Sequence, residues 1–199
     1  MFTIKRSQHN PILSPIRENS WESAASFNPS PAEYKKKKYV VYRALSEPDP
    51  LIGPNLRIST VAVASSSDGS YYDKRSILID ADSDFDRFGA EDPRVTKFDD
   101  TYYIFYTALG GFPFSDQNIK VAVALSKDLR TIQEKHLVTP FNAKAMGLFP
   151  EKVNGKMSAL VTINTDRKPS DICFVTFDSP EDLWNEEKWN EWYKTATTH

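Results

Sequence analysis

Three times along this chain, a pair of apolar, strand-like segments is followed by a polar turn that contains an aspartate. The pairs cover residues 39–45 and 58–65, 101–109 and 119–126, and 157–163 and 171–177. The turn residues Asp68 and Asp128 lie 60 residues apart, so the pairs repeat at a nearly constant spacing. A repeat of this length is one supersecondary unit that buries its apolar faces against its neighbours. The sequence therefore predicts consecutive sheets of the same kind.

The repeat favours an all-β fold of the β-propeller type, with about four strands in each unit. Aromatic residues make up 13% of the chain, and its 13 prolines outnumber its seven glycines. This composition suits short strands joined by turns, because aromatic and β-branched side chains fit a pleated, half-buried surface. A β-sandwich is the alternative, although its strands do not recur as similar pairs.

Two segments fall outside the repeat. Residues 1–35 are rich in Pro, Ser and Asn and have no apolar period, so we expect an extended N-terminal lead-in. Residues 36–199 are expected to form the propeller domain, which ends in a short amphipathic helix over 180–193. Aromatic residues recur at helical spacing in that helix, which favours core packing over a ligand platform; they are Trp184, Trp189, Trp192 and Tyr193.

Charge and composition argue against several classes of function. The net charge of −2 gives no general basic surface for nucleic acid or for an anionic membrane. No apolar run approaches the ~20 residues of a membrane span, and the N-terminus has no apolar signal segment, so we expect a cytoplasmic protein. Cys173 is the single cysteine and the histidines are far apart, so neither a disulfide nor a metal site is expected.

The polar residues that stand out lie at the start of a strand and inside another. Glu91 and Asp92 are followed by a proline and by Arg94, just before the strand expected at Val95. An arginine two residues after Asp92 lies on the same side of an extended chain and can bind hydroxyl, carboxylate or phosphate groups. Arg43 interrupts an apolar strand, so it needs either a polar ligand or an acidic partner such as Glu91 or Asp92. From residue chemistry alone, a structural turn with an ion pair explains these residues as well as a binding site does.

Together, the ordered motifs of the chain resemble glycoside hydrolase family 130, which contains β-mannoside phosphorylases and β-mannosidases with a five-bladed propeller. The matching pieces are Asn10-Pro11-Ile12-Leu13, Trp21, Phe27-Asn28-Pro29, Tyr42-Arg43, Ala64-Ser65 with Asp68-Gly69, Gly89 with Glu91-Asp92-Pro93-Arg94, Tyr103 with Tyr106-Thr107, and Phe149-Pro150-Glu151-Lys152 with Asn154-Gly155-Lys156. Each piece is weak by itself, and the ordered set is specific.

The resemblance implies roles for single residues. Asp92 matches the general acid of the phosphorylases, which passes its proton through a mannose hydroxyl to the glycosidic oxygen while phosphate attacks from the opposite face. Asn28, Arg43 and Arg94 match positions that bind the mannosyl unit, and Lys152 matches a basic position near the phosphate. The implied substrate is a β-mannoside oligosaccharide, with inorganic phosphate as co-substrate and no other cofactor.

Two alternatives stay open at this point. In the hydrolytic branch of the family, water replaces phosphate and two carboxylates are needed; residues 160–169 look more like that branch. The length raises the second alternative, because five blades need roughly 300 residues and this chain has about three blades. Either the sequence is a truncated product, or the missing blades come from a complementary chain or a second copy. Otherwise the chain is an inert carbohydrate-binding or assembly module, so the sequence leaves open whether it is an enzyme.

Overall fold

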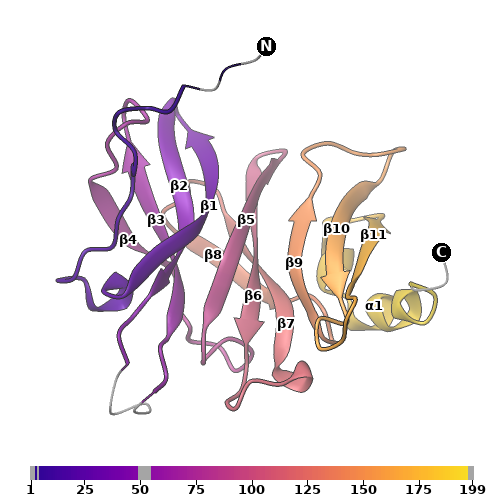
Figure 1. The fold of residues 1–199 in the computed structure, drawn as a ribbon. Coiled ribbons are helices and arrows are strands. Elements are labelled where there is room, and N and C mark those ends of the chain that lie inside the picture. Colours follow the sequence, from indigo (N-terminus) through magenta and orange to yellow (C-terminus); the bar gives the residue numbers. More distant parts are fainter. Residues whose placement is uncertain (1–2, 4, 49–54, 197–199) are drawn as a thin grey trace.

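A computed structural model describes residues 3, 5–48 and 55–196, and these residues form three antiparallel sheets that stand side by side in chain order (Figure 1). The first sheet contains β1 (Ala25–Tyr34), β2 (Lys37–Leu45), β3 (Ser59–Ser66) and β4 (Lys74–Ile79). The second contains β5 (Ala90–Phe98), β6 (Thr101–Leu109), β7 (Ile119–Ser126) and β8 (Ile132–Leu137). The third contains β9 (Ala143–Leu148), β10 (Met157–Ile163) and β11 (Asp171–Phe177). In each sheet the strands pair in chain order, which confirms the all-β class and the repeated unit.

The six strands predicted in pairs are all present. Residues 101–109, 119–126, 157–163 and 171–177 form β6, β7, β10 and β11 with the same ends, and 39–45 and 58–65 agree with β2 and β3 within two residues. These strands are easy to recognise because their apolar residues are packed between sheets. The other strands carry more polar residues, and of these only the strand at Val95, in β5, was expected from the sequence.

Residues 25–34 of the predicted lead-in form β1, an edge strand of the first sheet. Pro29 and Pro31 lie inside it, and an edge strand tolerates proline because one side of its backbone has no strand partner. Pairing with β2 runs from Tyr34↔Lys37 to Ala25↔Leu45 and is interrupted between Phe27 and Ser30. The predicted domain boundary at residue 35 therefore falls in the hairpin between two paired strands, and residues 197–199 of the predicted domain lie outside the described residues.

The core lies in the two layers between neighbouring sheets. Val41 and Val63 of the first sheet pack with Ile104 and Tyr106 of the second in one layer. Phe105, on the opposite face of β6, packs with apolar residues of the third sheet, among them Ala159 and Val161. Full burial of a Val, Ile or Phe side chain contributes about 1.5–3 kcal/mol, so the middle sheet, which is buried on both faces, joins the other two.

The N-terminal segment lies on the outer face of the first sheet, and a buried carboxylate joins it to the sheet. Glu22, at the end of the 3-10 turn Ser20–Glu22, is fully buried. It accepts hydrogen bonds from Tyr42 Oη at 2.8 Å and from Asn19 Nδ2 at 2.7 Å, and Arg75 Nη1 lies 3.3 Å from it. Burial and the adjacent carboxylate raise the pKa of Tyr42 far above its ordinary value, so this hydroxyl stays a hydrogen-bond donor.

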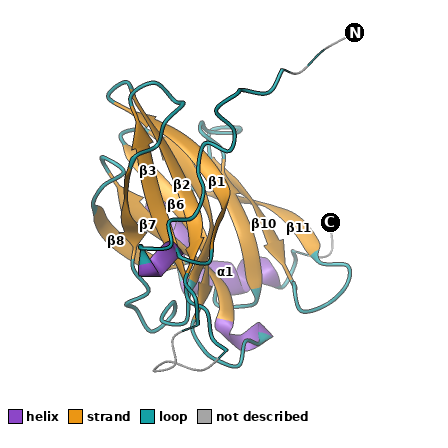
Figure 2. Ribbon diagram, turned by 60° about the vertical axis from the view of Figure 1, so that its left-hand side comes forward, coloured by secondary structure: helices purple, strands orange, loops and turns teal. Residues whose placement is uncertain are grey.

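The C-terminal segment supports the third sheet with two short helical pieces (Figure 2). A 3-10 turn, Pro180–Trp184, is followed by α1 (Glu186–Tyr193), whose N-cap Asn185 accepts the Lys188 N–H. The predicted helix over 180–193 is thus present with a break at Asn185. Trp189 is 1% exposed and donates its indole N–H to Leu183 O at 2.8 Å, as expected for core packing. Over the described residues, no helix has the length and apolar character needed to traverse a bilayer.

Candidate functional site

A β-bulge recurs in the first strand of each sheet. Pairing is interrupted after Phe27 in β1, after Glu91 in β5, and between Lys144 and Gly147 in β9. At each bulge one residue has a left-handed backbone: Asn28 with φ 50°, Asp92 with φ 53° and Ala145 with φ 48°. A bulge bends its strand and changes the direction of the side chains on it. The three sheets therefore present three side chains from equivalent positions.

Two of these positions hold residues suited to their backbone. Asn and Asp are the residues other than glycine that adopt positive φ most readily. Their side chains meet, because Asn28 Nδ2 donates a hydrogen bond of 2.6 Å to Asp92 Oδ1 across 64 residues of sequence. Pro29 and Pro93 follow them and fix the next φ angle. The Asn-Pro and Asp-Pro motifs are thus brought together in space.

Arg43 is the residue that links this pair to the rest of the cluster. Its Nε donates to Ser59 Oγ at 2.9 Å, its Nη1 lies 3.4 Å from Asp92 Oδ1, and its Nη2 pairs with Glu91 Oε1. The guanidinium also lies 4.8 Å from the centre of the Phe27 ring. The expected pairing of Arg43 with Glu91 or Asp92 is present with both carboxylates.

The two carboxylates differ in their surroundings. The Glu91 side chain is 13% exposed and that of Asp92 is 29% exposed, so Asp92 is the more accessible of the two. Burial raises the pKa of Glu91, and the neighbouring Asp92 raises it further, although Arg43 and Lys144 oppose this. Glu91 therefore serves mainly to hold Arg43, and Asp92 is the carboxylate that a ligand can reach.

Lys144 is the residue at this site that the sequence analysis missed. It precedes the bulge residue Ala145 just as Glu91 precedes Asp92, and its charge acts on Glu91. The signal was available from alignment of the repeats, since residues 143–147 correspond to 90–94. The motif is hard to see because Ala145 has replaced the Asn or Asp that marks the other two bulges.

The remaining predicted residues, Arg94 and Lys152, make no side-chain hydrogen bond or ion pair with Asn28, Arg43 or the Asp92 carboxylate. Arg94 is exposed, and its Nη1 turns back to Pro93 O at 3.0 Å and to Asp92 O at 3.5 Å. Lys152 is exposed in the connection from β9 to β10 and makes no hydrogen bond or ion pair within the described part of the chain. The structure therefore brings Asn28, Arg43 and Asp92 together and leaves Lys152 outside.

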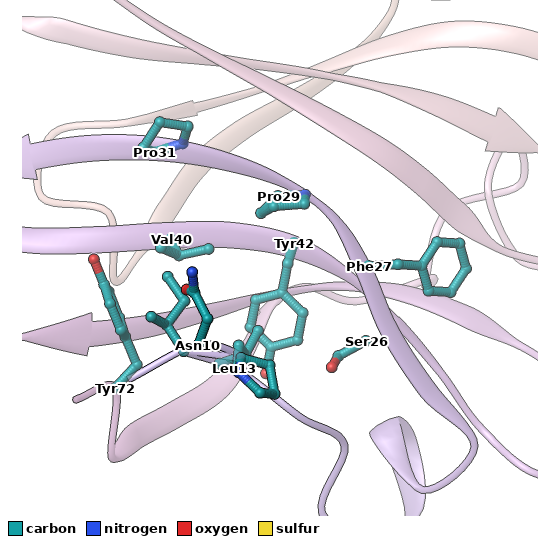
Figure 3. A pocket seen from close by; sticks show the side chains of 11 residues that line it. Asn10, Leu13, Ser26, Phe27, Pro29, Pro31, Val40, Tyr42 and Tyr72 are labelled. Atoms are coloured by element: carbon teal, nitrogen blue, oxygen red, sulfur yellow. The ribbon is translucent and has the colours of Figure 1, made fainter. Parts of the chain in front are cut away.

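A separate hollow of about 430 Å³ lies between the N-terminal segment and the outer face of the first sheet (Figure 3). Its lining is mostly apolar and includes Leu13, Pro29, Val40 and Tyr72. Phe27, which also contacts Arg43, lines it, whereas Asn28, Arg43, Glu91 and Asp92 do not. In residues 3, 5–48 and 55–196, no group of three or more His, Cys, Asp or Glu side chains is placed to hold a metal ion. The polar cluster around Asp92 is therefore our candidate site.

Known proteins are similar to this chain in sequence and in fold. Residues 4–189 match the family described as beta-1,4-mannooligosaccharide phosphorylase, glycoside hydrolase family 130. A 1,2-beta-oligomannan phosphorylase and a beta-1,2-mannobiose phosphorylase of Thermoanaerobacter sp. (strain X514) are each 32% identical to the chain, over 193 and 163 residues. These matches cover 94% and 78% of this chain and 61% and 53% of those proteins.

The solved structures agree on the fold. A beta-1,2-mannobiose phosphorylase from Listeria innocua superposes with a TM-score of 0.67 at 21% identity, covering 87% of this chain and 62% of that one. A glycosyl hydrolase from Bacteroides ovatus gives a TM-score of 0.69 at 25% identity, covering 87% and 55%. The chain thus spans less than two thirds of the proteins that it matches. On the family match and on the shared sequence, the chain belongs to glycoside hydrolase family 130.

Proposed function

We propose that the chain provides the sugar-binding and proton-donating part of an enzyme that breaks β-mannosidic bonds, by phosphorolysis or by hydrolysis. The observation that carries this proposal is the place of Asp92, held by the Asn28 amide and the Arg43 guanidinium while 29% of its side chain remains exposed. Two donors fix the carboxylate, and its exposed part is open to a ligand. The relatives described as mannobiose and oligomannan phosphorylases favour phosphorolysis.

In this proposal Asp92 is the general acid. Its proton passes through a mannose hydroxyl to the glycosidic oxygen, and the bond from that oxygen to the anomeric carbon breaks. Inorganic phosphate attacks the anomeric carbon from the opposite face, so the products are mannose 1-phosphate and the shortened mannoside. Asn28, Arg43 and Arg94 bind hydroxyls of the mannosyl unit, and hydrolysis would follow the same course with water in place of phosphate.

The phosphate site has two candidate lysines. Lys152 is the residue that the motif resemblance implies, and it is exposed and away from the cluster. Lys144 is a second candidate, because it lies at the bulge of β9 and its charge already acts on Glu91. Replacing each by methionine and measuring the KM for phosphate distinguishes them, since loss of a phosphate contact raises that KM with less effect on the affinity for mannoside.

We further propose that the three sheets are consecutive blades of a propeller in which the first strands lie nearest to the axis. The contacts of β5 with both β1 and β9 support this arrangement, because bulge-bearing strands then face a common centre. Residues 36–199, with β1 as a further strand, would form the partial propeller domain. Exposed apolar side chains on the outer face of the third sheet, Leu160, Ile172 and Phe174, support packing of a further sheet there, from a complementary chain or a second copy.

The test of the proposed function is turnover of β-1,2- and β-1,4-mannobiose with and without phosphate. Asp92→Asn is expected to lower kcat by about 10²–10⁴-fold and to change binding much less, because asparagine keeps the hydrogen-bonding shape and cannot donate the proton. Asp99→Asn is the matched control, since Asp99 is exposed, lies at the other end of β5 and also has a positive φ of 50°. Binding of mannobiose without turnover in the complete assembly would instead indicate an inert carbohydrate-binding module.

A further inference from the structure

Three phenylalanine rings form an exposed group beside the second sheet. Phe112 is 56% exposed and Phe114 is 43% exposed, although both are large apolar side chains. The Phe112 ring is stacked on that of Phe88, with centres 6.5 Å apart, and it meets the Phe114 ring edge-on at 5.4 Å. The Arg87 guanidinium lies 5.8 Å from the centre of the Phe88 ring, so a charged side chain borders the group of phenylalanine rings. Exposed apolar patches with a polar border often mark ligand-binding surfaces.

The aromatic group lies at the same end of the sheet as the candidate site. Glu91 at the bulge pairs with Thr107, near the end of β6, and the Phe88 N–H donates to Leu109 O at 2.9 Å. The connection of residues 110–118, which carries Phe112 and Phe114, leaves the sheet at that end (Figure 1). Phe88 lies four positions before Asp92 in the chain, so their Cα atoms are at most about 14 Å apart. The aromatic group and the candidate site are thus neighbours at one end of the sheet.

The connection is held in a fixed shape, as a binding platform requires. Asn118 Nδ2 donates to Pro113 O at 3.0 Å, and its Oδ1 accepts from the Ser115 N–H at 3.0 Å. Its backbone carbonyl accepts from the Gly110 N–H at 2.8 Å. At Gly111 a Cβ atom would lie 2.9 Å from Asn118 Nδ2, so this close approach needs a glycine. The two exposed rings are thus presented by an internally hydrogen-bonded loop.

We propose that Phe112 and Phe114 form a stacking platform for sugar units of a β-mannooligosaccharide that extend beyond the unit bound at Asp92. This inference rests on the proposed function and adds to it that substrates longer than a disaccharide are preferred. An aromatic face is apolar and flat, and the C–H face of a pyranose ring packs on it while the hydroxyls stay in water. Its place at the same end of the sheet as the Asp92 cluster makes the same oligosaccharide the natural occupant.

The test compares the binding of β-1,2-mannobiose, -triose and -tetraose by calorimetry. The parent is expected to bind the tetraose about 3- to 10-fold more tightly than the biose, as one aromatic contact would give. Phe112→Ala/Phe114→Ala should remove this gain and leave the biose affinity within about twofold of the parent value. Phe112→Leu/Phe114→Leu keeps apolar volume without a flat face and should remove the gain as well. Tyr71→Ala is the control, because Tyr71 is 64% exposed in the β3–β4 connection at the opposite end of the first sheet.

Each outcome supports or overturns the proposed stacking platform. A gain with chain length that disappears in both phenylalanine variants and persists in Tyr71→Ala supports the platform. A gain that survives in the phenylalanine variants, or a parent that binds all three sugars equally, overturns the platform and leaves the proposed function in place. A parent that binds none of the three sugars, the biose included, overturns both. Association of the parent into dimers that the phenylalanine variants lose, without a gain with chain length, would assign the patch to a protein contact instead.

Discussion

Replacing Arg43 by methionine tests whether the Asp92 cluster is held together as described. The guanidinium contacts Glu91, Asp92 and Ser59, and the Arg43 and Glu91 side chains are only 18% and 13% exposed. In Arg43→Met, Glu91 keeps the Ser59 hydroxyl at 3.3 Å as a donor but loses its ion-pair partner. Methionine fills much of the same volume, so the loss is mainly electrostatic.

The magnitude follows from the burial of the pair. Removing one partner of a fully buried ion pair costs about 3–5 kcal/mol, and the remaining exposure of this pair reduces our expectation to about 2–3 kcal/mol at pH 8. Burial already raises the pKa of Glu91 above its ordinary value of 4.5, and Arg43 is the strongest influence that lowers it. Without Arg43 this pKa rises further, and each unit of that rise corresponds to about 1.4 kcal/mol of the loss at pH 8.

The sign of the pH dependence gives a second check. A carboxyl whose folded-state pKa lies above its unfolded-state value binds more protons in the folded state, so stability falls as pH rises through the folded-state pKa. The deficit of Arg43→Met relative to the parent should therefore be smaller at pH 5 than at pH 8. Carboxylates other than Glu91 and Asp92, which both pair with Arg43, affect both proteins alike and cancel in the difference.

Urea unfolding followed by tryptophan fluorescence at the two pH values measures this deficit. The double variant Arg43→Met/Glu91→Gln is the control, because it removes the titrating group and should lose the extra pH dependence. A deficit below about 0.5 kcal/mol at pH 8, which is the range of ordinary surface substitutions, would refute the reasoning. So would an equal deficit at pH 5 and pH 8.

Three further predictions concern stability. Arg75→Met leaves the fully buried Glu22 without its cation, so urea unfolding should show a loss of about 3–5 kcal/mol, and Glu22→Gln in the same chain should recover part of it. Trp189→Ala removes a side chain that is 1% exposed, and the same assay should show a loss of about 3–5 kcal/mol. Asp171 has a pKa lowered by hydrogen bonds that include one from Arg167, so Asp171→Asn should be less stable than the parent at pH 7. That difference should vanish in a titration of stability as pH falls through the folded-state pKa, because a lowered carboxyl pKa stabilises only the charged form.

The strands that the sequence predicts are those with apolar residues packed between sheets. In β6 all residues but Thr101 are buried, and in β7 five of the eight are, so an apolar run marks both strands. β8 has no fully buried residue, and β4 has only two. An outer strand pairs through its backbone, and the backbone hydrogen bonds leave no pattern in side-chain polarity. These strands follow from the position of their neighbours rather than from their own sequence.

The candidate site also contains residues that have a local sequence signal and residues that have none. Asn28 and Asp92 are recognisable because each precedes a proline, and Arg43 because it is a charge in an apolar strand. Their convergence on one another depends on how two sheets pack, which no local motif specifies. Lys144 has no local signal, since Ala145 and Met146 stand where the other bulges have an Asn-Pro or an Asp-Pro pair.

The bulge of β9 shows that backbone geometry is a property of the repeated unit rather than of the residues at one site. Alanine gains nothing from a positive φ, because its side chain cannot form the local hydrogen bonds that favour Asn and Asp there, and the conformation costs about 1–2 kcal/mol. Ala145 nevertheless has φ 48°, close to the values at Asn28 and Asp92. Packing of β9 against the second sheet must therefore impose the bulge on a residue that does not prefer it. On this argument, the unit supplies the direction in which a side chain leaves the strand, and substitution at the bulge decides whether that position carries an amide, a carboxylate or no polar group.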